Sequence, residues 1–397
     1  MTLPSLRLKK NEDRRIRAGH LWVFSNEVDV GRTPLTGFEP GQPVQIEDSG
    51  GRVLGSGYVN PHSLIAARLV NRGSTRPPDR ALLDARLRRA LALRAALFPG
   101  PFYRLVFGEG DGLPGLIVDR FGEVLVVQLT TAGMERLRDD VVAALEEVVR
   151  PAGILLRNDS SGRALEGLES YIEIATGTVP DRVEIEENGT RFSVPLQTGQ
   201  KTGWFYDHRE NRARMQRYVP GKRVLDVFSY IGGWGVQAAA VGGASHVLCV
   251  DASAPALEDL RRNAELNGVG DRVATLHADA FEALRALKDS GESFDVVILD
   301  PPAFIKRKKD LKPGEQAYRR INRLAMDLLA AEGMLVSASC SFHFSRDSLR
   351  DAVLRASRAT NRDLQILEQG HQAPDHPVHP AIPETDYLKV IFGRVHA

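Results

Sequence analysis

The chain has 397 residues, of which 43% are hydrophobic and 26% are charged, and its formal net charge is +1. This length exceeds what one hydrophobic core usually supports, so we expect two or three domains of ordinary globular composition. The two cysteines are too few and too far apart to form a disulfide framework or a metal site. The sequence contains neither a signal-peptide pattern nor a membrane-spanning run, so we expect a cytoplasmic protein with no membrane partner.

Basic residues are unevenly distributed along the chain. Residues 1–99 contain 16 Lys and Arg against 9 Asp and Glu. Such an excess is typical of a module that binds a polyanion. A solvated, arginine-rich surface would explain the charge count equally well.

Residues 1–75 predict a small all-β domain, because short apolar runs alternate with turn residues such as Asp48–Gly51. A polar linker at 74–79 precedes a helix that ends near Phe98. Residues 76–195 as a whole predict a central α+β domain. Its expected strands are 104–107, 116–118, 124–129 and 153–157, its expected helix is 134–149, and its hairpin, 182–186 with 191–195, turns at Asn188-Gly189.

Residues 196–397 predict a doubly wound, Rossmann-like α/β domain, because strands and helices alternate. The expected strands are 223–228, 246–250, 273–277, 294–299 and 334–338. The expected helices are 234–241, 254–267, 280–288, 315–330 and 346–358. Two last strands, 364–369 and 386–395, are joined only by a loop, so we expect them to form an antiparallel hairpin at one edge.

Aspartates and glycines lie at the ends of the first three strands of this predicted sheet. Asp226 lies in the last part of the first strand and the turn at Gly232 follows it, Asp251 ends the second strand, and Asp279-Ala280 follows the third. Ligands of doubly wound sheets bind at these strand ends, and an acidic residue on the second strand is placed to bind the ribose of an adenosine group. Each aspartate alone could be a helix N-cap. Three in succession favour a nucleoside site, and the lack of a strict G-x-G-x-x-G pattern disfavours NAD.

The motifs of this region are Asp226-x-Phe228-Ser229-Tyr230-x-Gly232-Gly233, Val250-Asp251-x-Ser253, Asp300-Pro301-Pro302-x-Phe304 and Ser339-Cys340-Ser341. Together they resemble the bacterial 23S ribosomal RNA cytosine-C5 methyltransferase family. Thr202-Gly203-Trp204-Phe205-Tyr206-Asp207-x-Arg209-x-Asn211 is similar to the cofactor-covering segment of that family. The resemblance covers essentially the whole chain. It implies an N-terminal RNA-binding PUA domain, a central domain and a class I methyltransferase domain that uses S-adenosylmethionine.

The strand ends and the resemblance together indicate which residues bind the cofactor. They are Phe205, Asp207, Arg209, Asp226, Phe228, Ser229, Tyr230, Gly232, Gly233, Asp251, Ser253, Asp279, Ala280 and Asp300. The resemblance also implies ribosomal RNA, 23S above all, as the partner. The sequence leaves the oligomeric state open, a homodimer included.

Cys340 and Asp300 are the predicted catalytic residues. Cytosine C5 is a poor nucleophile until a thiolate adds at C6, and after methyl transfer a base must remove the C5 proton. Both residues follow strands whose ends meet at one sheet edge, and we expect Asp300 to hydrogen-bond the N4 amino group or N3 of the base. A lone cysteine is usually a small buried hydrophobe, the role we assign to Cys249. Pro301 stands where many RNA cytosine methylases carry a second cysteine, which leaves the base that removes the proton open.

The residues after Asp300 are predicted to contact RNA. Phe304 would stack on an extruded base, and the run Lys306, Arg307, Lys308 and Lys309 would bind the flanking phosphates. The alternatives are a core aromatic residue and a solvated loop.

Two other functions are compatible with parts of the sequence. Methylation of a purine nitrogen in ribosomal RNA would use the same Asp-Pro-Pro segment but needs no cysteine. A non-catalytic RNA-binding protein with a vestigial Rossmann domain would need neither Asp300 nor Cys340. The presence of both residues favours the cytosine-C5 reaction.

Overall fold

The computed structural model describes residues 3–396, which form two compact units. The first unit runs to Val183 and includes Pro195–Tyr206 and Pro374–Thr385. The second consists of Glu184–Val194, Asp207–Ala373 and the chain from Asp386 onward. Among the described residues, no helix combines the length and the apolar character of a membrane span.

These units depart from the predicted domains 76–195 and 196–397. Most of the predicted hairpin belongs to the second unit, whereas two segments predicted in the catalytic domain belong to the first. One reason is that Thr202 Oγ1 donates a buried hydrogen bond of 2.6 Å to Asp119 Oδ2. The predicted boundary lies where the regular alternation of strands and helices begins. That pattern does not reveal later segments that pack back into the first unit.

The first unit contains two five-stranded sheets, with strand orders β1-β3-β4-β5-β2 and β10-β9-β8-β7-β6. The strands of the first are β1 (Ser5–Arg7), β2 (Trp22–Val23), β3 (Gln42–Glu47), β4 (Val53–Val59) and β5 (Ala67–Arg72). Those of the second are β6 (Phe102–Phe107), β7 (Leu116–Phe121), β8 (Val124–Leu129), β9 (Gly153–Asn158) and β10 (Tyr171–Gly177). The helices are α1 (Arg14–Arg17), α2 (Arg80–Leu97), α3 (Ala132–Arg136) and α4 (Arg138–Val149).

Two details of this unit differ from the prediction. The single helix expected at 134–149 is two helices, because Leu137 has non-helical backbone angles (φ −94°, ψ 12°). Strand β10 is not predicted by the sequence because it lies at an edge and leaves Ile172 and Ile174 exposed. Apolar residues on its solvent face remove the alternation by which a strand is recognised.

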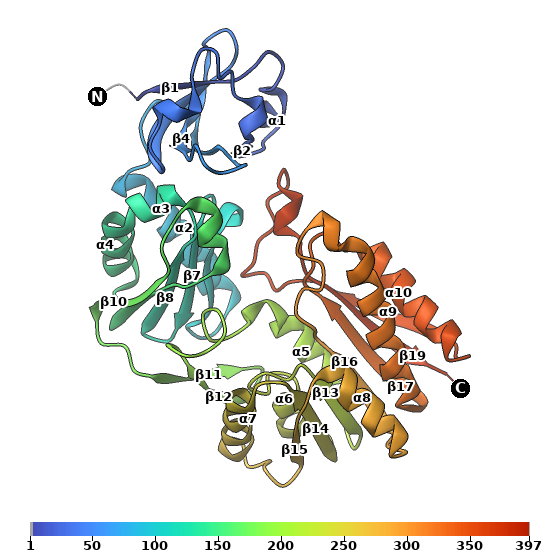
Figure 1. The fold of residues 1–397 in the computed structure, drawn as a ribbon. Coiled ribbons are helices and arrows are strands. Elements are labelled where there is room, and N and C mark those ends of the chain that lie inside the picture. The colour runs from blue at the N-terminus through green and yellow to red at the C-terminus, as the bar shows by residue number, and fades with distance from the viewer. Residues whose placement is uncertain (1–2, 397) are drawn as a thin grey trace. The chain divides into compact units, whose positions relative to one another are not determined.

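The second unit contains a seven-stranded sheet with the order β15-β14-β13-β16-β17-β19-β18. Its strands are β13 (Arg223–Val227), β14 (His246–Asp251), β15 (Val273–His277), β16 (Phe294–Leu299), β17 (Leu329–Ser339), β18 (Leu364–Gly370) and β19 (Lys389–Val395). The first five are parallel, and β19 is antiparallel to both of its neighbours. The doubly wound sheet and its antiparallel pair at one edge are confirmed (Figure 1).

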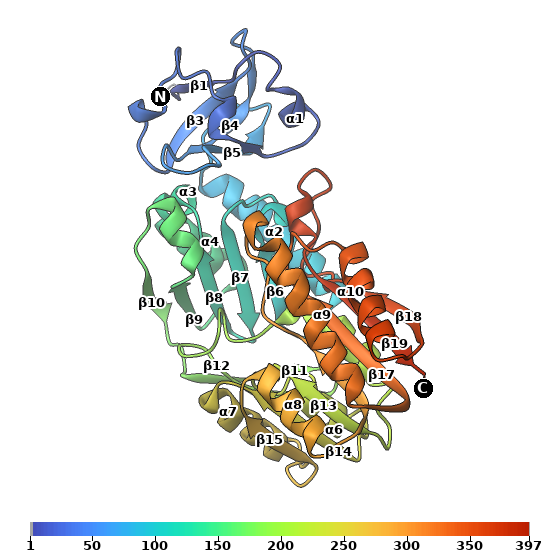
Figure 2. The same ribbon diagram turned by 45° about the vertical axis from the view of Figure 1, so that its right-hand side comes forward.

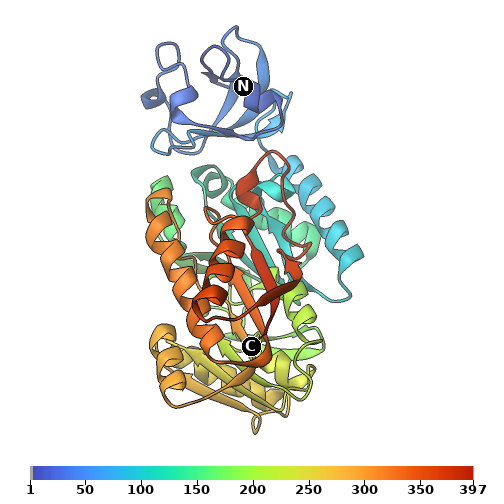
Figure 3. The same ribbon diagram turned by 90° about the vertical axis from the view of Figure 1, so that its right-hand side faces the viewer.

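Helices cover both faces of this sheet. They are α5 (Arg209–Met215), α6 (Gly235–Ala240), α7 (Ala254–Leu266), α8 (Ala280–Asp289), α9 (Leu311–Asp327) and α10 (Arg346–Ala359). Leu225 and Val227 of β13 share a core with α8, α9 and α10, whereas Asp226 between them faces α6. Figures 2 and 3 show α9 and α10 side by side along the sheet. Helix α9 begins before the predicted 315 because Pro313 fits the first turn of a helix.

The strands β11 (Arg182–Glu187) and β12 (Thr190–Pro195) form the predicted hairpin. Asn188 and Gly189 have φ values of 53° and 78°, the left-handed conformation that a two-residue hairpin turn requires. The hairpin is tied to α7 because Ser193 N donates to Asn263 Oδ1 at 2.8 Å.

Candidate active site

The loop after β13 has a strained backbone that hydrogen bonds hold in place. Phe228 and Tyr230 have φ values of 67° and 48°, although neither is glycine. Phe228 N donates to Val250 O at 2.9 Å, and Tyr230 N donates to Asp251 Oδ2 at 2.9 Å. Strained residues persist where the surroundings determine their conformation, and they cluster at binding sites. The loop is therefore shaped before any ligand arrives.

Gly232 in this loop can only be glycine. Its φ is 91°, and a Cβ there would lie 2.5 Å from Val236 and 2.9 Å from Leu260. A Cβ added at the neighbouring Gly233 would lie 3.0 Å from the guanidinium group of Arg212. The glycines that the sequence singles out thus allow the loop to pass close to α5, α6 and α7.

The three predicted aspartates have different surroundings. Asp226 is fully buried, and its Oδ2 accepts from Gly235 N at 2.9 Å. Asp251 is half-buried, and its Oδ1 accepts from Ser253 N at 2.9 Å. Asp279 is exposed and caps α8, where Ala280 is the first residue. Asp251 and Asp279 remain accessible to a ligand, whereas the buried Asp226 stabilises the end of the loop through its hydrogen bond with Gly235.

Burial raises the pKa of the Asp226 carboxyl to about 7, although the hydrogen bond from Gly235 opposes this shift. The nearby carboxylates of Asp300 and Asp251 act in the same direction as burial. Among the described residues, no group donates to Asp226 Oδ1. A protonated carboxyl suits such a place better than a buried charge of which only one oxygen accepts a hydrogen bond.

We expect Asp226→Asn to change how stability depends on pH. The carboxyl keeps its proton in the folded protein up to about pH 7, whereas in the unfolded chain it loses the proton near 3.9. Its contribution to the free energy of unfolding therefore falls as the pH rises between these values. Urea unfolding of the variant and the parent at pH 5 and pH 8 measures this. The variant should gain relative stability at pH 8, and an unchanged difference between the two proteins would contradict the prediction.

Asp300 has two partners that the sequence reasoning did not identify. Its Oδ1 lies 3.1 Å from His208 Nε2, and its Oδ2 accepts from Trp234 Nε1 at 3.0 Å. The rings of His208 and Trp234 also meet edge to face, with centroids 5.3 Å apart. Burial alone would raise the pKa of Asp300, but these neighbours and Arg212 hold it below its ordinary value. Asp300 is therefore a fixed, ionised acceptor at the end of β16.

The predicted cofactor-covering segment is divided between the two units. Phe205 lies in the first unit, where the Lys201 ammonium group sits 4.9 Å from its ring centroid. Asp207 and Arg209 lie in the second unit and are both buried. Asp207 Oδ2 accepts from Tyr387 Oη at 2.5 Å, and Arg209 forms an ion pair with Glu187 at 3.6 Å. These two residues have structural contacts of their own, so their role toward a cofactor stays a prediction.

Cys340 directly follows β17 and is half-buried, whereas Cys249 is fully buried in β14 as expected. Cys340 Sγ lies 3.9 Å from the carbonyl oxygen of Pro301, which follows Asp300. The two predicted catalytic residues are therefore on neighbouring strand ends. The burial of Cys249 raises the pKa of its thiol well above the ordinary value, which makes it unreactive.

A tyrosine holds both serines that flank Cys340. Tyr318 Oη accepts from Ser339 Oγ at 2.8 Å and lies 2.9 Å from Ser341 Oγ. Ser341 Oγ also accepts from Ile305 N at 3.1 Å, in the loop after β16. All four residues are buried. The turn that carries Cys340 is thus fixed to α9 and to the loop after Asp300.

The predicted RNA-contacting residues fall into two groups. The ring of Phe304 packs near Phe228, Phe281 and Tyr318, at centroid distances of 6.4, 6.1 and 4.9 Å. This packing supports the core alternative for Phe304. The four basic residues 306–309 are exposed immediately before α9.

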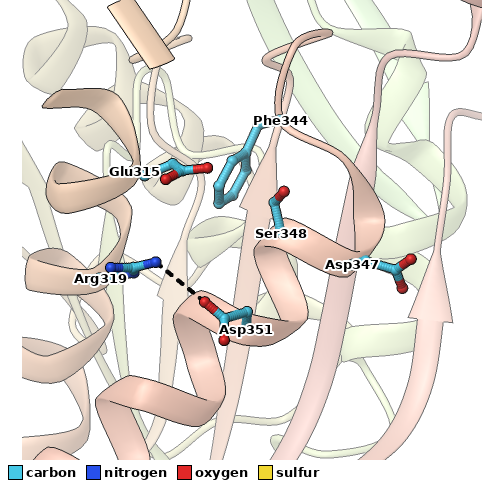
Figure 4. Close-up of a pocket in the computed structure, with 6 residues that line it drawn as sticks. All are labelled: Glu315, Arg319, Phe344, Asp347, Ser348 and Asp351. Carbon is cyan, nitrogen blue, oxygen red and sulfur yellow. Dashed lines mark hydrogen bonds and ion pairs between the residues drawn. The ribbon is translucent and has the colours of Figure 1, made fainter. Parts of the chain in front are cut away.

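A hollow of about 310 Å³ lies between α9 and α10 (Figure 4). Its lining residues are Glu315, Arg319, Phe344, Asp347, Ser348 and Asp351. Three carboxylates and one guanidinium group contribute to this lining, and the guanidinium of Arg319 is paired with Asp351 at 3.2 Å. Asp347 points away from Arg319 and pairs with Arg350 at 3.0 Å. None of the predicted site residues lines this hollow, and its charge is unsuited to a phosphate backbone.

Comparisons with known proteins show the family of the chain. A family described as S-adenosylmethionine-dependent methyltransferase matches residues 154–389, and a PUA-like domain family matches residues 6–72. Ribosomal RNA large subunit methyltransferase I of Shigella boydii is 38% identical over 395 residues, which cover 98% of each chain. The protein of the same name from Salmonella arizonae is 39% identical over 398 residues, covering 99% of this chain and 98% of its own.

Solved structures share the fold. A putative SAM-dependent methyltransferase from Streptococcus mutans matches with a TM-score of 0.83 at 19% identity, covering 99% of this chain and 100% of that one. A putative methyltransferase complexed with SAH matches with a TM-score of 0.85 at 20% identity and the same coverage. The predicted fold and S-adenosylmethionine as the cofactor are confirmed. The chain belongs to the S-adenosylmethionine-dependent methyltransferases, in the group that includes ribosomal RNA large subunit methyltransferase I.

Proposed function

We propose that this protein methylates C5 of a cytosine in large-subunit ribosomal RNA, in the cytoplasm, through an adduct between Cys340 and C6 of the base. The relatives' names support the RNA substrate. The position of a half-buried cysteine next to Pro301, in the loop that follows Asp300, supports the C5 reaction. This juxtaposition carries the proposal, because a ring or amino nitrogen is already nucleophilic and needs no thiolate.

The loop after β13 fits a nucleoside cofactor. Its strained residues bring backbone groups to the strand ends, and the carboxylates of Asp251 and Asp279 remain accessible beside them. We propose that Tyr230 and these two aspartates bind the adenosine part. When bound, S-adenosylmethionine supplies the electrophilic methyl group.

Each catalytic residue would have a separate task. Asp300, held ionised by His208 and Trp234, accepts a hydrogen bond from the N4 amino group of the target cytosine. It would not serve N3, because the lone pair of N3 requires a donor. Cys340 forms the S–C6 bond and is released when the C5 proton leaves. The exposed basic residues 306–309 bind neighbouring phosphates.

RNA containing 5-fluorocytosine tests this proposal. Fluorine replaces the C5 hydrogen, so the adduct cannot break down and should persist as a covalent protein–RNA complex. We expect a 23S transcript with this substitution and S-adenosylmethionine to yield a denaturation-resistant complex, with Cys340 as the linked residue by peptide mass spectrometry.

Two controls define the outcome. Cys249→Ala should still form the complex because Cys249 is fully buried, whereas Cys340→Ala should not. Methyl transfer to ordinary transcript without any trapped complex, with the methyl group mapped to a purine, would favour nitrogen methylation instead. RNA binding with no methyl incorporation would favour a non-catalytic protein.

A further inference from the structure

Lys389 lies beside the turn that carries Cys340, and the mechanism above does not use it. It is the first residue of β19 and pairs with Ser339 across the antiparallel strands. Its side chain is buried, and Nζ donates to Ser341 O at 2.7 Å and to Tyr387 O at 2.8 Å. The amino group therefore contacts the backbone one residue beyond the cysteine.

The surroundings of Lys389 are unusual for a lysine. Both of its hydrogen-bond acceptors are neutral carbonyl oxygens rather than carboxylates. Burial lowers the pKa of Lys389 to about 8, and Arg346 acts in the same direction, whereas Cys340 and Asp386 oppose the shift. Near neutral pH both the amine and the ammonium form are therefore accessible.

The two carbonyls occupy two of the positions around Nζ. In the ammonium form the third position is an N–H, and in the amine form it is a lone pair. A neutral Lys389 can thus keep both hydrogen bonds and still accept a proton. The charge of Cys340 acts on the pKa of Lys389, so the thiol lies within electrostatic reach of this amine.

We propose that Lys389 accepts the Sγ proton of Cys340 and stabilises the resulting thiolate for attack on the target base, an inference that rests on the proposed cytosine-C5 function. The S–H bond breaks and an N–H bond forms, so a neutral thiol and amine become a thiolate and an ammonium group. The thiolate then forms the S–C6 bond and is regenerated when that bond breaks. Lys389 is thus the general base for the thiol, and the C5 proton leaves to another base.

The rate of Cys340 alkylation by iodoacetamide, followed against pH in the full-length protein, tests the pairing without RNA. Only the thiolate reacts, and buried Cys249 serves as an internal reference in the same peptide digest. Lys389→Met removes the charge and both hydrogen bonds. Lys389→Gln is also neutral but keeps an amide NH₂ group that can donate to the carbonyls.

We expect both variants to move the alkylation midpoint of Cys340 upward by about one pH unit and to slow alkylation at pH 7 about tenfold. Lys288→Met removes an exposed lysine that pairs with Asp327, and it should leave the profile unchanged. Calorimetry with S-adenosylhomocysteine checks that each variant is folded. A Lys389→Gln profile equal to that of the parent would overturn the proposal and assign Lys389 a structural role.

The two proposals can fail separately. An unchanged alkylation profile together with a trapped 5-fluorocytosine adduct would remove the role of Lys389 alone. The absence of an adduct in the parent protein, with methylation found on a purine, would remove the cytosine-C5 function whatever the alkylation profile.

Discussion

Cys340→Ala is expected to lower the rate of methyl transfer to ribosomal RNA by at least about a thousandfold, because it removes the nucleophile that activates C5. Cys340→Ser should be almost as inactive, since a hydroxyl at this place is a far weaker nucleophile than a thiolate. The measurement is incorporation of labelled methyl groups from S-adenosylmethionine into 23S transcript, under single-turnover conditions.

Binding of the cofactor separates this effect from a loss of structure. The affinity for S-adenosylhomocysteine should stay within about threefold in both variants, because the thiol acts on the base and not on the cofactor. The half-buried position of Cys340 also makes a large loss of stability unexpected. Near-normal turnover of Cys340→Ala would reject the C5 mechanism and favour methylation of a purine nitrogen.

Glu187→Leu is expected to reduce the free energy of unfolding by about 3–5 kcal/mol. The Glu187 side chain is fully buried at the end of β11, where it pairs with Arg212 at 2.7 Å and accepts from Gln237 at 3.0 Å. Arg212 is itself buried. Removing the carboxylate takes an ion-pair partner away from two buried guanidinium groups, those of Arg212 and Arg209, which is the costly way to break a buried ion pair.

Urea unfolding followed by circular dichroism measures the loss. Glu186→Leu changes the exposed neighbour on the same strand, and it should alter stability by no more than about 0.5 kcal/mol. The double variant Glu187→Leu/Arg212→Met should recover part of the loss, because the charge of Arg212 is removed together with its partner. The rest of the loss should remain, since Arg209 also loses its ion pair with Glu187. If the double variant is less stable than Glu187→Leu, the ion pair is not the source of the effect.

Local patterns were sufficient to predict most of the catalytic sheet. The alternation of strands and helices predicts that the strands are parallel, and Asn188-Gly189 predicts the hairpin, because both depend on neighbouring residues. The aspartates at strand ends could be located for the same reason. Asp279 shows the limit of such reasoning. It is the N-cap of α8, as the alternative interpretation held, and its side chain is also exposed to a ligand.

The sequence did not predict the contacts between residues that lie far apart in the chain. His208 lies inside the motif that includes Asp207 and Arg209, but its contact is with Asp300, which follows β16. Lys389 likewise looks like an ordinary strand residue until β19 is placed beside β17. Its burial, not its sequence neighbours, makes it unusual. Such residues become visible only when the topology of the sheet is known.

The interleaving of the two units has a consequence for how the chain folds as it is synthesised. Proteins are generally thought to complete one domain after another as they leave the ribosome. Here the first unit needs Pro374–Thr385, and the second needs β19 between β17 and β18. Neither unit can reach its final structure until nearly the whole chain has emerged. Until then β17 and β18 each lack a partner strand, so a nascent chain stalled before Lys389 would present open sheet edges to chaperones or to its neighbours.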